Sequence, residues 1–559
     1  MLTREDQQPL LEIQNLEIIF QQEAAVPAVK NLSLRIGKKK FTAIVGESGS
    51  GKSLTSLSIL QLLPPNASVS GSIVFHDRQT IQDLCEADEP TMRSVRGNRI
   101  SMIFQEPMTS LNPVMRCGDQ VAEVFHTHQA LDKKSAREKT ISIFREVELP
   151  DPQNIIHRYP HELSGGQRQR VMIAMALASN PALLIADEPT TALDVRVQQR
   201  IILLLKKLQQ AHNMSVLFIT HDLGLVADIA DDVLVMRNGI IIEQGPADVV
   251  LKTPVEAYTK NLLDCRPSAH PPKTRLPEFE TPVNPQQPIP FESLITTEII
   301  LEVKDLTVHI KENKTGIEKT ILNRLSFDLY TGELIGLVGE SGCGKTTLGK
   351  AIVGLQPISG GSIRFGKQQL FPSTEIKNRA IAQQIQMVFQ DPFGSLDPKL
   401  NIGNAIMEPL LVHGIGNNKA ERRLMAEEML DLVKLSPAVF SRYPHEFSGG
   451  QRQRICIARA LVMHPSLLIF DESVSALDVS VQASILNLIA DLKQKLGFSA
   501  IFISHDLSVI HHLSDRIMVM EKGRIIEQGQ ASEVFFHPKQ HYTQQLIDAI
   551  PGKTTGSPH

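Results

Sequence analysis

The sequence contains 559 residues, of which 42% are hydrophobic and 21% are charged, and its formal net charge is −4. The length suits three or four domains, or two large ones. The charge balance argues against a dedicated nucleic-acid binder, and five cysteines without a C-x-x-C pair indicate neither a zinc site nor a disulfide framework. The N-terminus has no apolar core segment and no apolar run reaches the ~18–20 residues that span a bilayer, so we expect neither a signal peptide nor a membrane-spanning helix.

The first motif with chemical meaning is a glycine-rich loop after a buried strand. It fits G-x-x-x-x-G-K-[ST], whose backbone N–H groups surround the phosphates of a nucleotide. In this pattern Lys52 reaches the β- and γ-phosphates and Ser53 binds Mg²⁺, and a helix is expected over 54–63. Apolar patterns predict three strands before the loop, at 11–20, 28–36 and 41–45. The complete loop is Gly46, Glu47, Ser48, Gly49, Ser50, Gly51, Lys52 and Ser53.

A less regular stretch follows this loop. Residues 71–75 and 100–104 have strand-like patterns, and Gln105 comes directly after the second of them. Between these strands, residues 76–90 are acidic and polar, so we interpret them as a surface insertion. Residues 118–148 are mostly helical in pattern.

Twelve residues at 159–170, YPHELSGGQRQR, come before an expected helix at 167–178. A serine and two glycines before a helix leave unpaired N–H groups facing outward, and the helix dipole adds partial positive charge there. Ser164, Gly165 and Gly166 therefore suit a phosphate group.

Two acids end the next apolar strand, at 183–188. Ionised carboxylates at the end of a buried strand are costly without partners, and a Mg²⁺ ion and a polarised water account for them. We therefore expect Asp187 to hold Mg²⁺ and Glu188 to act as general base or orienter for the attacking water. A strand at 216–219 leads to His221.

A proline-rich segment then separates two halves of the chain. Eight prolines fall within the 24 residues from Pro267 to Pro290, which predicts a stiff, extended linker outside any core. We place a first domain at 1–265, the linker at 266–295 and a second domain at 296–559.

The second half repeats the motifs of the first. Eleven of the twelve positions at 159–170 return at 443–454, and the signature serines, strand-end acids and histidines are all offset by 284 residues. The loop lysines lie 293 residues apart but the following glutamines only 285, so the first copy has eight more residues between them. The repeated residues are Gly339, Glu340, Ser341, Gly342, Cys343, Gly344, Lys345, Thr346, Gln390, Ser448, Gly449, Gly450, Asp471, Glu472 and His505.

Leu-Ser-Gly-Gly-Gln, the core of the repeated stretch, is the signature of ATP-binding-cassette (ABC) ATPases, and the chain resembles two fused ABC nucleotide-binding domains. The resemblance implies an α/β fold of two tandem P-loop domains, each with a RecA-like core, an antiparallel β subdomain and a helical signature subdomain. It implies ATP and Mg²⁺ as cofactors, with each ATP held between the phosphate loop of one domain and the signature of the other. It assigns catalytic roles to Glu188, His221, Gln105, Glu472, His505 and Gln390, and magnesium contacts to Ser53, Gln105, Asp187, Thr346, Gln390 and Asp471.

Both copies keep the lysine, glutamate, signature serine and histidine, so we predict two competent sites. The family usually stacks adenine on an aromatic residue near the first strands. Phe20 fits that role in the first copy, whereas the matching position of the second copy is Ile310, beside His309, and is not aromatic.

The sequences around Gln105 and the tails, which begin with Tyr258-Thr259 and Tyr542-Thr543, resemble the peptide/nickel importer branch. The resemblance implies two integral-membrane permease subunits and a solute-binding protein as partners, and no nucleic acid. It implies a peripheral position on the cytoplasmic face of the bacterial inner membrane, with membrane contact only through the permease. Branch members often carry a C-terminal cysteine cluster for an iron–sulfur centre, but only Cys265 lies in such a region, so we predict no cluster.

Two other functions are compatible with ABC motifs. A soluble ribosome-associated or DNA-repair ATPase is disfavoured by the proline-rich linker and the scattered cysteines. A regulatory nucleotide-binding module without turnover is disfavoured by Glu188 and Glu472. The transported solute does not follow from the sequence, because a subunit of this kind touches only the permease.

Overall fold

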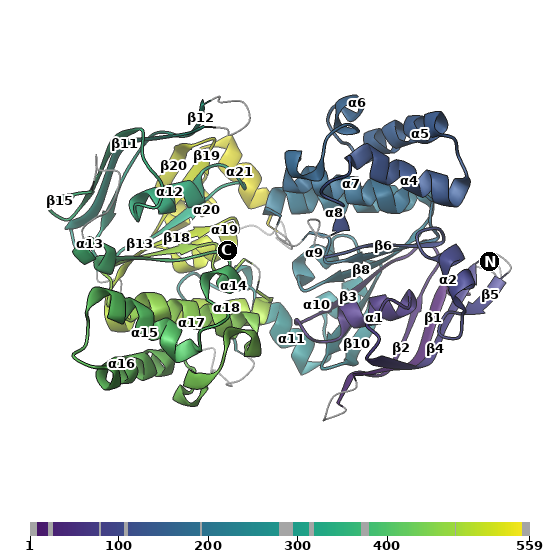
Figure 1. Cartoon of the computed structure of the whole chain (residues 1–559), viewed down its shortest axis with the longest axis horizontal. Coiled ribbons are helices and arrows are strands. Elements are labelled where there is room, and N and C mark those ends of the chain that lie inside the picture. Colours follow the sequence, from purple (N-terminus) through teal and green to yellow (C-terminus); the bar gives the residue numbers. More distant parts are fainter. Residues whose placement is uncertain are drawn as a thin grey trace. The chain divides into compact units, whose positions relative to one another are not determined.

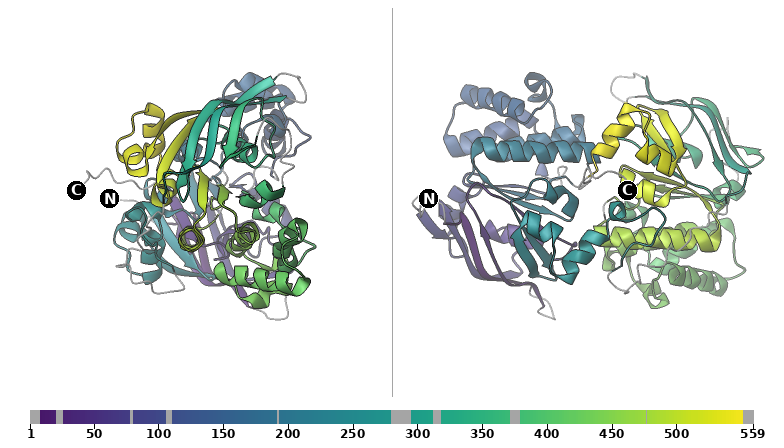
Figure 2. Two further views of the ribbon diagram at one scale, coloured as in Figure 1. Left: turned by 90° about the vertical axis from the view of Figure 1, so that its left-hand side faces the viewer. Right: turned by 180° about the vertical axis from the view of Figure 1, so that it is seen from behind.

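The computed structural model of the protein describes residues 8–20, 26–77, 80–105, 110–190, 193–278, 295–311, 318–370, 379–475 and 477–550. The chain divides into two compact units, the first formed by nearly all residues up to 263 and the second by those from 264 onward. Each unit contains a four-stranded antiparallel sheet, a six-stranded sheet and a group of helices (Figure 1, Figure 2). In the part of the chain that the structure describes, no helix is both long and apolar enough to cross a bilayer.

The antiparallel sheet of the first unit grows from strands with alternating burial. Leu11 and Ile13 are buried on one face, and the alternation then shifts at Asn15, whose φ of 50° marks a break in register before Leu16. The predicted strands at 11–20 and 28–36 are confirmed. Across the sheet the strands are β2 (Pro27–Ile36), β1 (Leu11–Phe20), β4 (Ala67–Asp77) and β5 (Thr80–Asp83).

The six-stranded sheet of the first unit carries the phosphate loop at its centre. Five of its strands are parallel neighbours, and only β10 runs antiparallel to β9. The carboxyl ends of the parallel strands therefore meet at one edge, where ligands bind in sheets of this type. In spatial order the strands are β10 (Ile240–Pro246), β9 (Asp232–Arg237), β3 (Phe41–Gly46), β8 (Ser215–Thr220), β7 (Leu183–Asp187) and β6 (Ile100–Ile103).

Hydrophobic cores lie on both faces of this sheet. Along β8, Val216 and Phe218 enter a core shared with the helices, whereas Leu217 and Ile219 enter a core shared with the antiparallel sheet. Burial on both faces explains why these strands are continuously apolar in sequence. The helices of the unit are α1 (Lys52–Ile59), α2 (Glu89–Val95), α4 (Cys117–Gln129), α5 (Lys133–Glu146), α6 (Pro152–Ile155), α7 (Gly165–Leu177), α8 (Val195–His212), α9 (Leu223–Ala227), α10 (Ala247–Lys252) and α11 (Ala257–Asp264).

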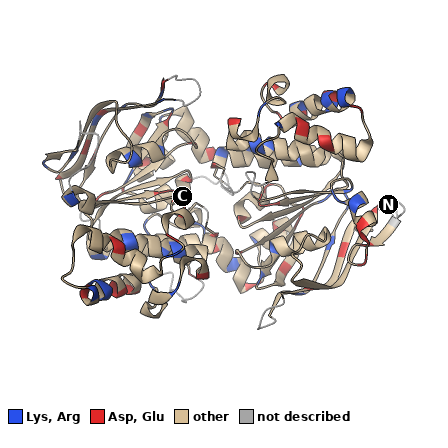
Figure 3. Cartoon of the chain, in the orientation of Figure 1, with Lys and Arg blue, Asp and Glu red and all other residues tan. Residues whose placement is uncertain are grey.

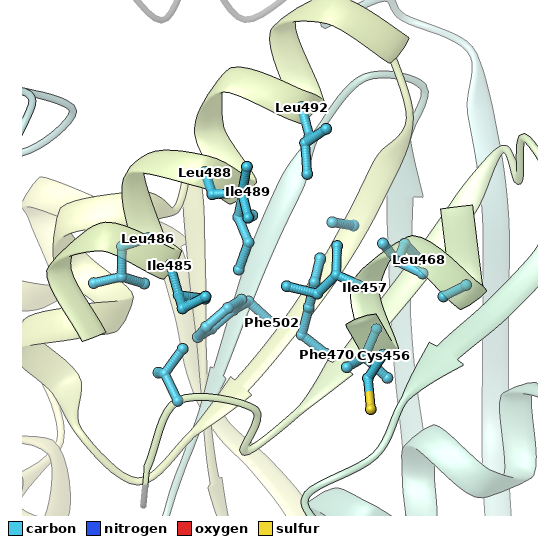
Figure 4. Close-up of a cluster of buried hydrophobic side chains, with 14 of the residues drawn as sticks. Cys456, Ile457, Leu468, Phe470, Ile485, Leu486, Leu488, Ile489, Leu492 and Phe502 are labelled. Carbon is cyan, nitrogen blue, oxygen red and sulfur yellow. The ribbon is translucent and has the colours of Figure 1, made fainter. Parts of the chain in front are cut away.

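The second unit repeats this architecture. Figure 4 shows part of its core, where Phe470 and Phe502 from the central sheet meet Ile485 and Ile489 from a helix. Its antiparallel sheet has the order β12 (Glu318–Tyr330), β11 (Ile299–Lys311), β14 (Gly360–Phe365) and β15 (Gln368–Gln369). Its central sheet has the order β16 (Ile385–Val388), β17 (Leu467–Asp471), β18 (Ser499–Ser504), β13 (Leu334–Val338), β19 (Arg516–Glu521) and β20 (Arg524–Gln530). Its helices are α12 (Lys345–Ile352), α13 (Arg379–Gln384), α14 (Pro392–Ser395), α15 (Ile402–His413), α16 (Lys419–Leu432), α17 (Gly449–Leu461), α18 (Val479–Leu496), α19 (Leu507–Leu513), α20 (Ala531–Phe536) and α21 (His541–Asp548).

The helix after the first phosphate loop is shorter than expected. It was predicted over 54–63, but α1 ends at Ile59. Gln61 adopts a left-handed conformation with φ of 49°, and the Leu62 N–H donates to the Leu57 carbonyl at 2.9 Å. This arrangement is a Schellman-type end, so the helix stops four residues before its predicted end at 63.

The interpretation of 76–90 as a surface insertion is confirmed at Ile81, which is 66% exposed, but it is wrong for Leu84. Leu84 is fully buried in the core beneath the antiparallel sheet, and its N–H donates to the Ile73 carbonyl at 2.7 Å. Leu370 makes the same backbone bond to Ile363 in the second unit, so the two leucines correspond. Four of the eight extra residues of the first copy lengthen this hairpin: the β4–β5 turn closes at Asp77 and Thr80, two residue pairs beyond Phe75. The equivalent turn in the second unit closes directly at Phe365 and Gln368.

We expect Leu84→Ala to destabilise the first unit by about 2–5 kcal/mol, because the change leaves a cavity in a packed core. Urea denaturation of the purified chain measures this loss as a lower midpoint. Ile81→Ala is the matched control from the same hairpin, since the Ile81 side chain is 66% exposed. Equal midpoints for the two variants would restore the surface interpretation.

The described part of the proline-rich segment also packs into a core, contrary to the prediction. Leu276 is fully buried, as is Cys265 just before the segment, and Asn487 on α18 binds both the N–H and the carbonyl of Leu276, at 3.0 and 2.9 Å. The Lys273 ammonium pairs with Asp515. The proline content predicted an extended segment outside any core. In the structure, these contacts instead hold residues up to 278 against the second unit. The domain limits at 1–265, 266–295 and 296–559 stay predictions.

Candidate functional site

The first phosphate loop is closed by its own lysine. Gly51, with φ of 100°, caps α1 in the left-handed region that glycine adopts without strain. Lys52 is buried, and its ammonium donates to the backbone carbonyls of Gly46 and Glu47, both at 2.8 Å. The loop is therefore curled around a positive charge that suits a phosphate group.

Gly46, the first loop glycine, has a steric reason to be glycine. A Cβ atom there would lie 2.2 Å from the carbonyl oxygen of Met236 at the end of β9. Gly339 repeats this contact, with a Cβ atom 2.2 Å from the carbonyl oxygen of Met520. Each phosphate loop therefore starts, after β3 or β13, so close to the backbone of the neighbouring strand that no side chain fits at this position.

The hydroxyl of Ser53 and the carboxylate of Asp187 lie together beneath the loop. Ser53 Oγ donates to Asp187 Oδ1 at 3.0 Å. Burial raises the pKa of Asp187 to about 6, although the bond from Ser53 opposes the shift. Two hard oxygen ligands this close fit Mg²⁺, whose charge would favour the ionised carboxylate.

Glu188 is the point where three predicted catalytic residues meet. Its Oε2 atom accepts a hydrogen bond from Gln105 Nε2 at 3.0 Å and lies 3.3 Å from His221 Nδ1. Its φ of 44° places a non-glycine residue in the left-handed region, a conformation that costs about 1–3 kcal/mol and is concentrated at functional sites. The Glu188 N–H donates to the Ile219 carbonyl at 2.9 Å, which holds this backbone in place.

The order of the strands in the sheet explains why Gln105 and His221 lie beside Glu188. β6 and β8 flank β7, so the residues that follow their carboxyl ends converge on the residue that follows β7. β3 lies beside β8 and brings the phosphate loop to the same edge. The spacing of these residues in the sequence does not reveal which strands are neighbours in the sheet.

The second unit builds the same constellation. Lys345 donates to the carbonyls of Gly339 and Glu340 at 2.7 and 3.0 Å, and its ammonium lies 3.6 Å from Glu472 Oε1. The remaining equivalent distances are 3.0 Å from Thr346 Oγ1 to Asp471 Oδ1, 3.0 Å from Gln390 Nε2 to Glu472 Oε2, and 3.5 Å from His505 Nδ1 to Glu472 Oε2.

The two adjacent acids of the second unit have opposite pKa shifts. Burial raises the pKa of Asp471. Burial also acts to raise the pKa of Glu472, but the bond with His505 and the charges of His505 and Lys345 outweigh it, so the pKa of Glu472 is lowered. Glu472 is therefore ionised at neutral pH, as a general base must be.

The signature residues lie at the starts of two helices, where the structure shows helix caps. Ser164 Oγ accepts from the Gln167 N–H at 3.3 Å, and Gln167 Oε1 accepts from the Ser164 N–H at 3.0 Å. This capping box was missed in the sequence, although S-x-x-Q is its signal. Helix α7 consequently starts at Gly165, two residues before its predicted start. Ser448 and Gln451 repeat the box before α17.

The second signature glycine also has a packing role. A Cβ atom at Gly166 would lie 2.8 Å from Val197, and one at Gly450 would lie 2.3 Å from Val481.

The candidate adenine residue Phe20 is partly buried against the core of the antiparallel sheet, whereas Ile310 is 40% exposed. Phe20 stays a predicted adenine contact.

Sequence reasoning missed one pair of residues near the loops. The tail tyrosines were used only as marks of a family branch, yet the Tyr258 hydroxyl lies 3.3 Å from Glu47 Oε2. The Tyr542 hydroxyl accepts from the Glu340 N–H at 3.0 Å. The sequence did contain a signal for this pair: Tyr-Thr occurs in both tails, and the two copies are 284 residues apart, the same offset that separates the catalytic histidines.

Comparisons with known proteins identify the family of this chain. The ABC transporter family model matches residues 29–191 and 322–475, and the model for the oligopeptide/dipeptide transporter C-terminal region matches 242–290 and 526–557. Among solved structures, a dimeric bacterial ABC transporter cassette matches 42% of this chain and 98% of its own, with 29% identity and a TM-score of 0.38.

Curated relatives are similar over nearly the whole chain. The glutathione import ATP-binding protein GsiA of Escherichia coli strain CFT073 is 44% identical, covering 97% of this chain and 89% of the relative. The protein of the same name from Pectobacterium atrosepticum is 43% identical with the same coverage. The chain therefore belongs to the ABC transporter family, as an ATP-hydrolysing protein with two ABC domains, each followed by an oligopeptide/dipeptide transporter C-terminal region.

Proposed function

We propose that this protein powers a binding-protein-dependent importer for peptides or related solutes, with glutathione as the first solute to test. The observation that carries the proposal is the 44% identity to glutathione import ATP-binding proteins over 97% of the chain. The partners would be two integral-membrane permease subunits and a solute-binding protein. The chain would be peripheral, on the cytoplasmic face of the bacterial inner membrane.

The proposed chemistry is the same in both units. The phosphate-loop lysines bind the β- and γ-phosphates, and the strand-end glutamates orient and deprotonate the attacking water. His221 and Gln105 hold the Glu188 carboxylate in position through the contacts at 3.3 and 3.0 Å. Mg²⁺, when bound by Ser53 and Asp187 with Gln105, would neutralise charge on the phosphates. Thr346, Asp471 and Gln390 would serve the second unit, and the signature residues would contact the nucleotide in the ATP-bound state.

The surface charge favours a protein partner over nucleic acid. Figure 3 shows Lys and Arg interspersed with Asp and Glu on the helices, and the net charge is −4. A nucleic-acid binder instead needs a continuous basic face.

Reconstitution tests this function. The chain is placed in proteoliposomes with the proposed permease subunits and solute-binding protein, and ATPase activity is measured with glutathione, dipeptides, oligopeptides and nickel chelates. We expect the chain to sediment with membranes only when the permease subunits are present, and one solute class to stimulate ATP hydrolysis. Tight binding to protein-free vesicles, or hydrolysis indifferent to the permease and to every solute, would contradict the proposal.

A further inference from the structure

Each C-terminal tail helix touches the second residue of the phosphate loop in its own unit. In the second unit, the Tyr542 hydroxyl accepts from the Glu340 N–H at 3.0 Å. In the first unit, Tyr258 donates to the Glu47 carboxylate at 3.3 Å, and its hydroxyl also interacts with the Glu47 backbone. Both tyrosines are the second residue of their helix, α11 or α21.

The opposite side of the same loop residue is held by the loop lysine. Lys52 donates to the Glu47 carbonyl at 2.8 Å, and Lys345 donates to the Glu340 carbonyl at 3.0 Å. The lysine therefore holds the carbonyl of this residue, while the tail tyrosine contacts the same residue at the Glu340 N–H or at the Glu47 carboxylate. When phosphate draws the ammonium toward itself, the tyrosine contact remains to hold the loop.

The tail helices are anchored in a way that makes this contact rigid. Glu527 on β20 accepts from the N–H groups of Lys539 and Gln540 and from the hydroxyl of Thr543. Glu243 on β10 likewise accepts from the N–H groups of Val255 and Glu256. One carboxylate in each unit therefore fixes the turn directly before the tyrosine.

The tyrosines have the protonation state that the contact needs. Burial is the largest cause that raises the pKa of both Tyr258 and Tyr542, so each phenol stays neutral and both donates and accepts hydrogen bonds. The Tyr258 ring also lies beneath Arg237, with the guanidinium 4.7 Å from the ring centroid. Packing therefore accounts for the rings, but not for a hydroxyl placed on the loop backbone in both units.

We propose that Tyr258 and Tyr542 are positioning residues for ATP, which set nucleotide affinity by fixing the second residue of each phosphate loop. The proposal rests on the assignment of these loops as the nucleotide sites. It gives the oligopeptide/dipeptide C-terminal region, which contains both tyrosines, a role at the nucleotide. Neither tyrosine is expected to take part in the chemical step.

The test removes only the hydroxyl groups. Tyr258→Phe is made in a Lys345→Ala background, which leaves the first loop as the intact site, and Tyr542→Phe in a Lys52→Ala background. Binding of a fluorescent ATP analogue is measured in each, together with kcat, KM and the melting temperature of the two single variants in the otherwise intact chain. We expect Kd and KM to rise about three- to tenfold, the loss of one hydrogen bond, with kcat within about twofold. Tyr330→Phe, at the end of β12, is the matched control.

The outcomes separate the possible roles. A lower melting temperature with unchanged Kd and KM shows a purely structural tyrosine and overturns the proposal. Unchanged values throughout overturn it as well, and so does a fall in kcat with KM unchanged. If the Lys52→Ala and Lys345→Ala backgrounds themselves bind the analogue at both sites like the native chain, the loop assignment fails instead.

Discussion

Replacement of Glu188 or Glu472 by glutamine is expected to lower ATP turnover by about 10²–10⁴-fold while ATP binding is retained. The amide keeps the size of the side chain and one oxygen that accepts from Gln105 or Gln390, whose amide nitrogens lie 3.0 Å from the native carboxylates. It cannot accept a proton from the attacking water. The loss should therefore appear in kcat, with the Kd for ATP close to the native value.

The single and double variants together test whether both sites work. Each single variant should lower turnover sharply, and Glu188→Gln with Glu472→Gln should remove it almost completely. Glu148→Gln is a matched control, because the Glu148 side chain is half exposed and its carboxylate pairs with Arg170 and Lys207. Steady-state phosphate release measures turnover. Native rates in both single variants and in the double variant would show that the catalytic assignment is wrong.

Much of the fold was predictable because its signals are local. The strand at 11–20 was placed to the residue, since its alternating apolar residues report burial directly. The phosphate loops were equally clear, because the first glycine of each loop lies against a backbone carbonyl that leaves no room for a Cβ atom. The residue set around Glu188 followed from motif resemblance, whereas its geometry required the order of β6, β7 and β8.

The errors came from single residues with non-local partners. Leu84 stands alone in an acidic run and carries no periodic signal, yet the β4–β5 pairing directs it into the core. Leu276 lies among prolines, and its burial depends on Asn487, 211 residues later in the chain. The tail tyrosines resemble ordinary helix residues until α11 and α21 are placed beside the loops. In each case the missing information was tertiary contact.

Replacement of the loop lysines by alanine is the second change with a large expected effect. Lys52→Ala or Lys345→Ala removes the charged contact to the phosphates, and hydrogen bonds to charged groups contribute about 1.5–3 kcal/mol each. Two such contacts correspond to a rise in the Kd for ATP of at least about 10²-fold at the altered site. The loop also loses its closure, since the carbonyls of Gly46 and Glu47 no longer receive the ammonium.

Equilibrium titration with a fluorescent ATP analogue distinguishes loss of the site from loss of the fold. Lys52→Ala should retain one class of site, the one built by Lys345, and the double variant should retain none. The melting temperature of each variant without nucleotide should stay near the native value, because the lysine contacts lie within the loop and not in a hydrophobic core. Lys38→Ala, at an exposed turn before β3, controls for the loss of a positive charge. A buried ammonium group inside each phosphate loop matches a polyphosphate better than any other ligand. If the double variant, which lacks both ammonium groups, still bound ATP with native affinity, the nucleotide would have to bind elsewhere.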